Sequence, residues 1–361
     1  MQHPARVNDV LHPISTLRPV AAALADMVAA SLHAAPRALP IAEAAGLILA
    51  QDLTVGSDIP ARATALRSGY AVIARDLVGV SAYAPLLASP PPWVDAGQAL
   101  PSGLDAIVPA DAVSVRGSFV EIVASPSPGE NVRRVGEDAQ SGECLRRRGD
   151  LVRACDVAAA LAAGVERAIV HTMIVRGYTD PSVEVLAPVL AGLCGANVGT
   201  DRWSSDAAST MVGASLVVVA SHDRAALDLL DRTGRVIASG LALRCAEMVV
   251  VGLVDGTPVI VAPPRLDTLV ALAYTLIQRF VDAIAGRQGL PAWRRACLSR
   301  KLSSTVGLTE LALVRDVAGL IEPLSVGSLT PSALARADGY VIIPPESEGF
   351  QAGAMVEADG L

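Results

Sequence analysis

Apolar positions recur at helical spacing in several stretches of the first half of the chain. Residues 16–35 predict one helix, and residues 41–53 predict a second, shorter helix that runs into an extended segment. Residues 149–170 predict a further helix with Gly164 as its stop signal. Because residues 51–140 interrupt this pattern, we expect the helices on either side of them to pack together as one discontinuous domain.

The helical pattern gives way to short β-rich pieces between these helices. Residues 51–140 contain short apolar and β-branched runs that are separated by Gly, Pro and Ser turns. The clearest runs are 70–75, 106–113 and 118–124. The pattern predicts a small β domain that is inserted into the helical one.

From residue 171 onward, short apolar strands alternate with helical segments. The predicted strands are 171–178, 196–203, 214–221 and 257–263, and the predicted helices are 182–195, 206–213, 223–234 and 265–286. This alternation predicts a parallel sheet with helices on both faces, and ligands bind such sheets at the carboxyl ends of the strands. Those ends are 176–178, 221–223 and 263–265 here.

The predicted fold class is a multi-domain α/β plus β protein. The expected domains are a discontinuous N-terminal domain over 1–50 and 141–170, an inserted β domain over 51–140, a three-layer α/β domain over 171–289 and a barrel-like C-terminal β domain over 290–361. A chain of 361 residues is long enough for several domains with sizeable cores.

The net charge of the chain argues against two classes of binding partner. The net charge is −7 and both signs are interspersed, so neither nucleic acid nor a membrane is expected as a partner. The densest basic cluster contains Arg146, Arg147 and Arg148, with Arg133 and Arg134 nearby. This cluster is either a solvated surface or an anion site.

Cysteine usage and the apolar runs indicate a cellular compartment. The five cysteines include no Cys-x-x-Cys pair, which argues against a disulfide framework or a zinc site and for a reducing compartment. The N-terminus lacks the pattern of a signal peptide, and the apolar runs are shorter than the ~18 residues of a membrane span. We expect a soluble, cytoplasmic protein.

Several motifs occur in an order that resembles one known family. They are "SGYAVIARDL", "PSGLDAIVPADAV", "GENVRRVGEDAQSGECL" and "GSLTPSALARADGYVIIPPESEGFQAGAMVEA". In this order they resemble the MoeA family, the molybdopterin molybdotransferases that include the E domain of gephyrin. The resemblance runs from about residue 18 to the C-terminus, and it implies a MoeA-like fold.

The resemblance implies a reaction and a site. Family members take adenylated molybdopterin and molybdate, and release AMP and molybdenum cofactor with the help of a divalent cation such as Mg²⁺. Their site lies between the α/β domain of one subunit and the β insert of the other, which implies a homodimer. The matching candidates for ligand binding are Ser68, Tyr70, Arg133, Arg134, Asp138, Ser221, His222, Arg244 and Arg265, with Asp138 also the candidate metal ligand. No catalytic residue is assigned.

The motifs that carry the family's chemistry are altered in this sequence. Ser68 stands where the family has the Asp before Gly-Tyr, and Ala96 stands where it has a threonine. The glycine-rich phosphate loop corresponds to 221–223, whose side chains stand where bare backbone is needed. The family's K-P-G-K and P-G-N-P segments correspond to 244–247 and 263–266. These changes predict weak or lost catalysis.

Three functions therefore stay open at the level of sequence. The first is a divergent molybdotransferase. The second is a non-catalytic carrier or chaperone that holds molybdopterin or the finished cofactor. The third is a dimeric scaffold or regulatory partner with no small ligand or cofactor. The expected protein partner is a molybdoenzyme or another protein of cofactor synthesis.

Overall fold

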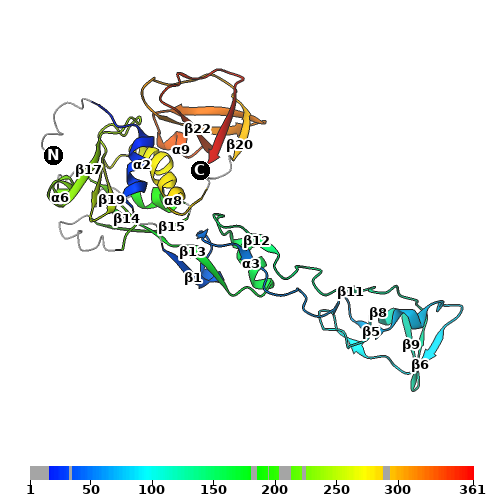
Figure 1. The fold of residues 1–361 in the computed structure, drawn as a ribbon. Coiled ribbons are helices and arrows are strands. Elements are labelled where there is room, and N and C mark those ends of the chain that lie inside the picture. Colours follow the sequence, from blue (N-terminus) through cyan, green and yellow to red (C-terminus); the bar gives the residue numbers. More distant parts are fainter. Residues whose placement is uncertain are drawn as a thin grey trace.

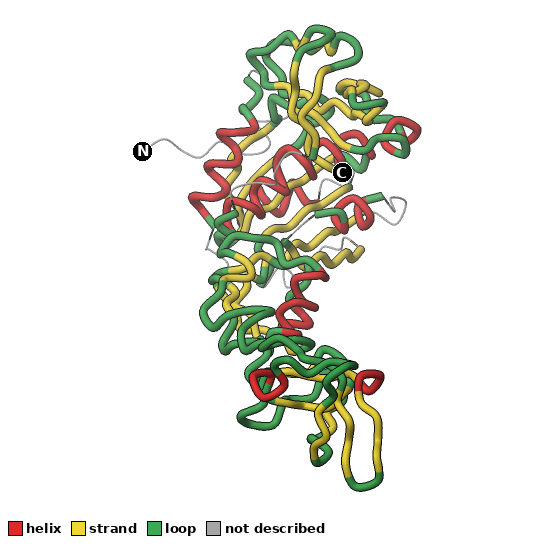
Figure 2. Tube along the Cα trace, turned by 90° about the vertical axis from the view of Figure 1, so that its right-hand side faces the viewer, coloured by secondary structure: helices red, strands yellow, loops and turns green. Residues whose placement is uncertain are grey.

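The computed structural model describes residues 16–31, 35–179, 185–193, 195–202, 213–221, 225–287 and 293–361. The molecule is elongated, with the α/β part and the C-terminal sheet at one end and the β insert at the other (Figure 1). A middle part lies between them, as the turned view in Figure 2 also shows.

A six-stranded sheet of order β15-β14-β16-β19-β18-β17 forms the α/β part. Its strands are β14 (Met173–Thr179), β15 (Ala196–Arg202), β16 (Leu216–Ala220), β17 (Gly234–Ser239), β18 (Val250–Val254) and β19 (Thr257–Ala262). The first three and β19 are parallel, which confirms the predicted parallel sheet. The antiparallel hairpin of β17 and β18 was not predicted.

Helices cover both faces of this sheet. They are α2 (Val20–Ala30), α4 (Leu186–Ala191), α6 (Ala225–Thr233), α7 (Leu266–Leu272) and α8 (Gln278–Ile284), with a π-helical turn (Ala273–Ile277) between the last two. Val217 and Val219 belong to the same core cluster as Leu230 of α6, and Val218 packs in the opposite cluster with Phe280 of α8. This two-sided burial explains the uninterrupted apolar run of β16. Most of the predicted helix 206–213 lies outside the described residues.

Helix α2 belongs to the α/β core. Its buried residues Val20, Ala23 and Met27 share a core cluster with Phe280 of α8, and the backbone N–H of Arg18 donates to the carbonyl of Gly240 at 3.0 Å. The expected packing of this helix with the helix after the insert is therefore wrong. Helix α2 packs instead on α8 and on the strands β17, β18 and β19 of the α/β part.

Short strands and one helix form the middle part. They are β1 (Pro36–Pro40), β2 (Ile48–Leu49), β3 (Leu53–Thr54), β12 (Cys144–Arg146), β13 (Arg167–His171) and α3 (Ala154–Ala162), with a 3₁₀ turn at Ile41–Glu43. The predicted helix over 41–53 is wrong. Gly46 has a φ of 81°, which a helix does not accommodate, and β2 pairs with β13 instead.

The insert is rich in strands, as the sequence predicted. A three-stranded sheet contains β7 (Trp93–Val94), β5 (Gly69–Val72) and β8 (Ala106–Pro109), and a second contains β6 (Leu86–Ala88), β10 (Phe119–Ile122) and β9 (Val113–Arg116). β4 (Thr64–Ala65) pairs with β11 (Val132–Arg133), and 3₁₀ turns span Ala74–Leu77 and Ala110–Ala112.

The C-terminal part is a sheet of order β20-β26-β24-β22-β23, which confirms a strand-rich end of the chain. Its strands are β20 (Arg294–Cys297), β22 (Glu310–Val317), β23 (Leu320–Val326), β24 (Gly339–Ile343) and β26 (Met355–Gly360), beside the pair β21 (Leu302–Ser303) and β25 (Gly349–Phe350) and the short helix α9 (Pro331–Leu334). Among the residues that the structure describes, none of the helices is long and apolar enough to cross a membrane.

Candidate functional site

The predicted site residues fall into two groups that lie in different parts of the chain. Ser68, Tyr70, Arg133, Arg134 and Asp138 lie in or beside the insert, whereas Ser221, Arg244 and Arg265 lie at the carboxyl edge of the α/β sheet. His222 falls outside the described residues. The insert and the α/β sheet occupy opposite ends of the molecule (Figure 1), so one chain does not bring the two groups together.

Ser68 and Tyr70 flank the start of β5 and hold neighbouring loops. The Ser68 hydroxyl oxygen accepts a hydrogen bond from the backbone N–H of Ala96 at 3.0 Å. The Tyr70 ring meets the Trp93 ring edge to face, with centroids 5.2 Å apart and planes at 85°. The two positions at which the sequence departs from the family's Asp and Thr, Ser68 and Ala96, are thus hydrogen-bonded to each other.

A ribbon of two paired segments, 58–67 and 131–141, carries the arginines of the first group. β4 and β11 pair within it, and the backbone N–H of Asp138 donates to the carbonyl of Ile59 at 2.9 Å. Arg133 Nη1 lies 3.2 Å from Asp138 Oδ2, and both side chains are exposed. Glu137 accepts from the backbone N–H of Arg134 at 2.7 Å. The candidate metal ligand Asp138 therefore already has a cationic partner.

Arg265 lies at the second group and begins helix α7 at the sheet edge. Its guanidinium contacts both carboxylate oxygens of Asp267, at 3.1 and 2.6 Å. This contact is the main reason why the pKa of Asp267 lies below its ordinary value. Ser221 directly follows β16, where it is buried and its backbone N–H donates to the carbonyl of Ala262 at 3.1 Å. The ion pair with Asp267 partly neutralises the positive charge of Arg265.

An open cavity of about 330 Å³ lies between the start of α7 and the C-terminal part. Its lining consists of Arg265, Leu266, Asp267, Ser328, Leu329, Thr330 and Pro331. Arg244 is exposed close to this junction, and its backbone N–H donates to the carbonyl of Thr309 at 2.9 Å. The cavity places polar groups of two domains around one opening.

Cys245 joins the loops of this edge, and sequence reasoning missed its role. The thiol donates to the carbonyl of Gly327 at 2.7 Å, and the Cys245 carbonyl accepts from the Thr268 hydroxyl at 2.6 Å. Burial, with Asp267 close by, raises the pKa of the thiol to about 11. Its φ of 69° is a value that usually favours glycine. The available sequence signal was the position itself, because Cys245 stands in the segment that matches the family's K-P-G-K.

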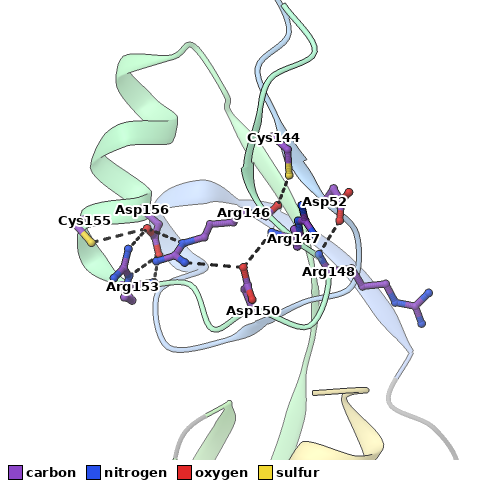
Figure 3. Close-up of polar contacts among 9 residues, drawn as sticks. All are labelled: Asp52, Cys144, Arg146, Arg147, Arg148, Asp150, Arg153, Cys155 and Asp156. Atoms are coloured by element: carbon purple, nitrogen blue, oxygen red, sulfur yellow. Dashed lines mark hydrogen bonds and ion pairs between the residues drawn. The ribbon is translucent and has the colours of Figure 1, made fainter. Parts of the chain in front are cut away.

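Among the arginines at 146–148, Arg146 has its side chain built into the middle part, whereas the side chains of Arg147 and Arg148 are exposed (Figure 3). Arg146 Nε and Arg153 Nη2 lie 3.0 and 2.9 Å from the same oxygen of Asp156. These contacts hold the pKa of Asp156 well below its ordinary value, with the Arg153 hydrogen bond as the largest cause. The backbone N–H of Arg148 donates to Asp52 at 2.7 Å. Arg146 therefore has a structural role, and the side chain of Arg148 remains exposed.

The fold and site define a multi-domain α/β protein with an inserted β domain and a strand-rich C-terminal domain. A model of the MoeA N-terminal region (domains I and II) matches residues 18–164, and a model of the MoeA C-terminal region (domain IV) matches residues 295–359. Together these matches cover more than half of the chain. The chain belongs to the MoeA family, as its motifs predicted.

Named relatives and solved structures agree with this assignment. Molybdopterin molybdenumtransferase 2 of Mycobacterium tuberculosis is 24% identical over 89% of this chain and 94% of its own length. Molybdopterin molybdenumtransferase 1 of the same organism is 28% identical over 43% of this chain and 44% of its own. Two crystal structures of a molybdopterin biosynthesis MoeA protein from Pyrococcus horikoshii superpose with TM-scores of 0.70 and 0.67. They cover 96% and 95% of this chain and 99% of their own, at 21% and 20% identity, and they confirm the MoeA-like fold.

Proposed function

We propose that this chain serves molybdenum cofactor biosynthesis as a MoeA-like protein whose own catalysis of molybdate insertion is weak or lost. The hydrogen bond between Ser68 and Ala96 is the observation that carries the second part of this proposal. A neutral hydroxyl stands there in place of the family's carboxylate. Removal of one well-placed electrostatic group costs about 3 kcal/mol of transition-state stabilisation, which is roughly a 100-fold loss of rate.

The Mg²⁺ of the family reaction does not fit the groups around Ser68. A hard divalent cation needs several charged oxygen ligands, and Asp138 is paired with Arg133. Within the described ranges, no cluster of three or more His, Cys, Asp or Glu side chains could hold a metal ion. The donor chemistry around Ser68 therefore supports loss of the metal-assisted step.

The ligand that we propose is molybdopterin or its adenylated form, with molybdate as the second substrate if catalysis persists. The inserted β domain and the carboxyl edge of the α/β sheet lie at opposite ends of one chain (Figure 1). A homodimer in which the insert of one chain approaches the sheet edge of its partner would join them. We propose this arrangement for a protein that works in the cytoplasm.

Release of AMP tests the catalytic part of the proposal. Purified protein is mixed with adenylated molybdopterin, molybdate and Mg²⁺ beside a family member that retains the Asp before Gly-Tyr. We expect AMP release at least ~100-fold slower than in that control. Release at a comparable rate would show that Ser68 and the altered loops still support the reaction.

A carrier function is the second candidate, and the cavity beside Arg265 favours it. This cavity of about 330 Å³ lies at the junction of two domains and places Arg265 and Thr330 around one opening. Co-elution of a fluorescent oxidised pterin with protein purified from a host that makes molybdopterin would support a carrier for a molybdoenzyme. Protein that elutes free of pterin, and that takes up none when molybdopterin is added, would favour a scaffold or regulatory partner.

A further inference from the structure

We propose that the face of the insert around Ser68 binds the anionic group of its ligand directly, without a divalent cation. The proposal rests on the proposed function only for the identity of the ligand, which carries a phosphate. Two kinds of donor carry it: the Ser68 hydroxyl and the exposed arginines of the two-segment ribbon that ends at Arg67.

The hydrogen bond of Ser68 occupies its hydroxyl oxygen as an acceptor and leaves its hydrogen as a donor. The oxygen accepts from the backbone N–H of Ala96 at 3.0 Å, so the hydroxyl hydrogen remains available to donate. Arg67 precedes Ser68 directly and is exposed. A hydroxyl donor with an arginine as its chain neighbour suits a phosphate oxygen, whereas a neutral hydroxyl oxygen is a poor ligand for Mg²⁺.

The two-segment ribbon gathers further arginines on the same part of the insert. The backbone N–H of Leu66 donates to Asn131 at 2.9 Å, and that of Gly136 donates to Pro60 at 3.2 Å. These bonds join the segments that carry Arg62, Arg67, Arg133 and Arg134, all of which are exposed; of these, Arg133 also contacts Asp138. Guanidinium groups bind phosphate through paired N–H donors, and no metal is required for that contact.

The carboxylates of this region are already engaged with donors. The acceptors and their donors are Asp58 with the Ser141 N–H (2.8 Å), Asp95 with Trp93 Nε1 (2.9 Å), Glu130 with the Ser127 N–H (2.8 Å), Glu137 with the Arg134 N–H (2.7 Å) and Asp138 with Arg133 Nη1 (3.2 Å). Each of these acids holds a turn or an ion pair. A divalent cation would have to draw several of them away from these donors, and the turns would lose their hydrogen bonds.

The test is the binding of adenosine monophosphate to the full-length protein by isothermal titration calorimetry, in EDTA and in excess MgCl₂. The wild-type dissociation constant should change less than about twofold between the two conditions and should rise with ionic strength. Arg67→Ala should weaken binding about tenfold. Arg148→Ala removes an exposed arginine from the middle part and should leave binding unchanged.

Ser68→Asp provides the reciprocal test because it returns a carboxylate to the face. We expect it to weaken binding at least about tenfold, because the carboxylate repels the phosphate, and MgCl₂ should not restore binding because the neighbouring acids are engaged. Thermal unfolding checks that each variant is folded; if Ser68→Asp does not fold, the EDTA comparison and Arg67→Ala decide.

Three results would overturn the proposal. Wild-type binding that requires Mg²⁺ would show a metal site, and equal losses in Arg67→Ala and Arg148→Ala would show only general charge attraction. Complete absence of nucleotide binding would also overturn it. Molybdopterin that is retained by the protein would still support the proposed function in each of these cases, so the two proposals fail separately.

Discussion

Gly69 is the residue on which the position of Ser68 depends. A Cβ at Gly69 would lie 2.4 Å from the carbonyl oxygen of Val108 and 2.7 Å from Ile107 Cγ2, so β5 and β8 could not keep their spacing. We expect Gly69→Ala to lower the free energy of unfolding by about 1–3 kcal/mol, measured in urea. Gly56→Ala is the matched control because a Cβ there meets nothing within 4 Å. Equal stability of the two variants would contradict the close-contact argument.

Cys245 should be unreactive in the folded protein. With a pKa of about 11, its thiol is ionised in only about one molecule in a thousand at pH 8, and the thiolate is the form that alkylates. Cys144 and Cys155 are exposed and should be labelled by iodoacetamide first. Peptide mass spectrometry over time measures this order, and labelling in urea provides the control. Early labelling of Cys245 in folded protein would show that its contact with Gly327 opens readily.

At the scale of one element, Asp156 fixes the start of helix α3. It accepts from the Arg153 backbone N–H at 2.9 Å and contacts the side chains of Arg146 and Arg153. Folding lowers its pKa, so the ionised carboxylate stabilises the fold above pH ~4, and this contribution is lost as the pH falls below that value.

The Asp156→Asn variant should therefore be less stable by about 1–2 kcal/mol at pH 7, and its stability should fall less steeply in acid than that of the wild type. Urea unfolding at several pH values measures both effects. Asp76→Asn is the control, because Asp76 is exposed and lies 3.4 Å from the exposed Arg75. A variant with an unchanged acid profile would show that Asp156 does not supply the pH dependence.

Elements with strong local patterns could be predicted, and elements defined by distant partners could not. The apolar run of β16 indicates a strand that is buried on both sides, and the structure has it there. The apolar residues of 41–53 also recur at helical spacing, but Ile48 and Leu49 are buried as a strand because β13 supplies their partner from more than a hundred residues away. Periodicity alone does not contain that pairing.

The candidate site shows the same limit. Motif spacing found Ser68, Arg133 and Arg265 because the family places functional groups at those positions. It could not show that Asp267 neutralises Arg265, or that Cys245 connects two domains, because both facts depend on how loops from separate elements meet. Side-chain partners across domains are tertiary information.

For the whole molecule, the proposed homodimer predicts complementation between two damaged chains. Arg67→Ala damages the insert face and Arg244→Ala damages the sheet edge. In this arrangement each site combines an insert and a sheet edge from different chains. When the two variants are mixed equally and refolded together, half of the dimers contain one chain of each kind, and one of the two sites in such a dimer is intact. The mixture should therefore regain about a quarter of the nucleotide-binding sites.

Titration of the mixture with adenosine monophosphate measures this fraction. The double variant that carries both changes in one chain, refolded alone, provides the baseline. A mixture that stays at this baseline would show that the two surfaces do not complete each other across a dimer.

Helix α2 has a further consequence for how the chain is made. The helix spans Val20–Ala30, but the sheet that it packs on begins with Met173 and includes Ala262. A ribosome adds roughly 5–20 residues per second, so the helix emerges on the order of ten seconds or more before that sheet is complete. Its apolar face is uncovered throughout this time, while the middle part and the insert can fold. During synthesis, α2 is therefore the first helix whose apolar face is available for a chaperone to bind.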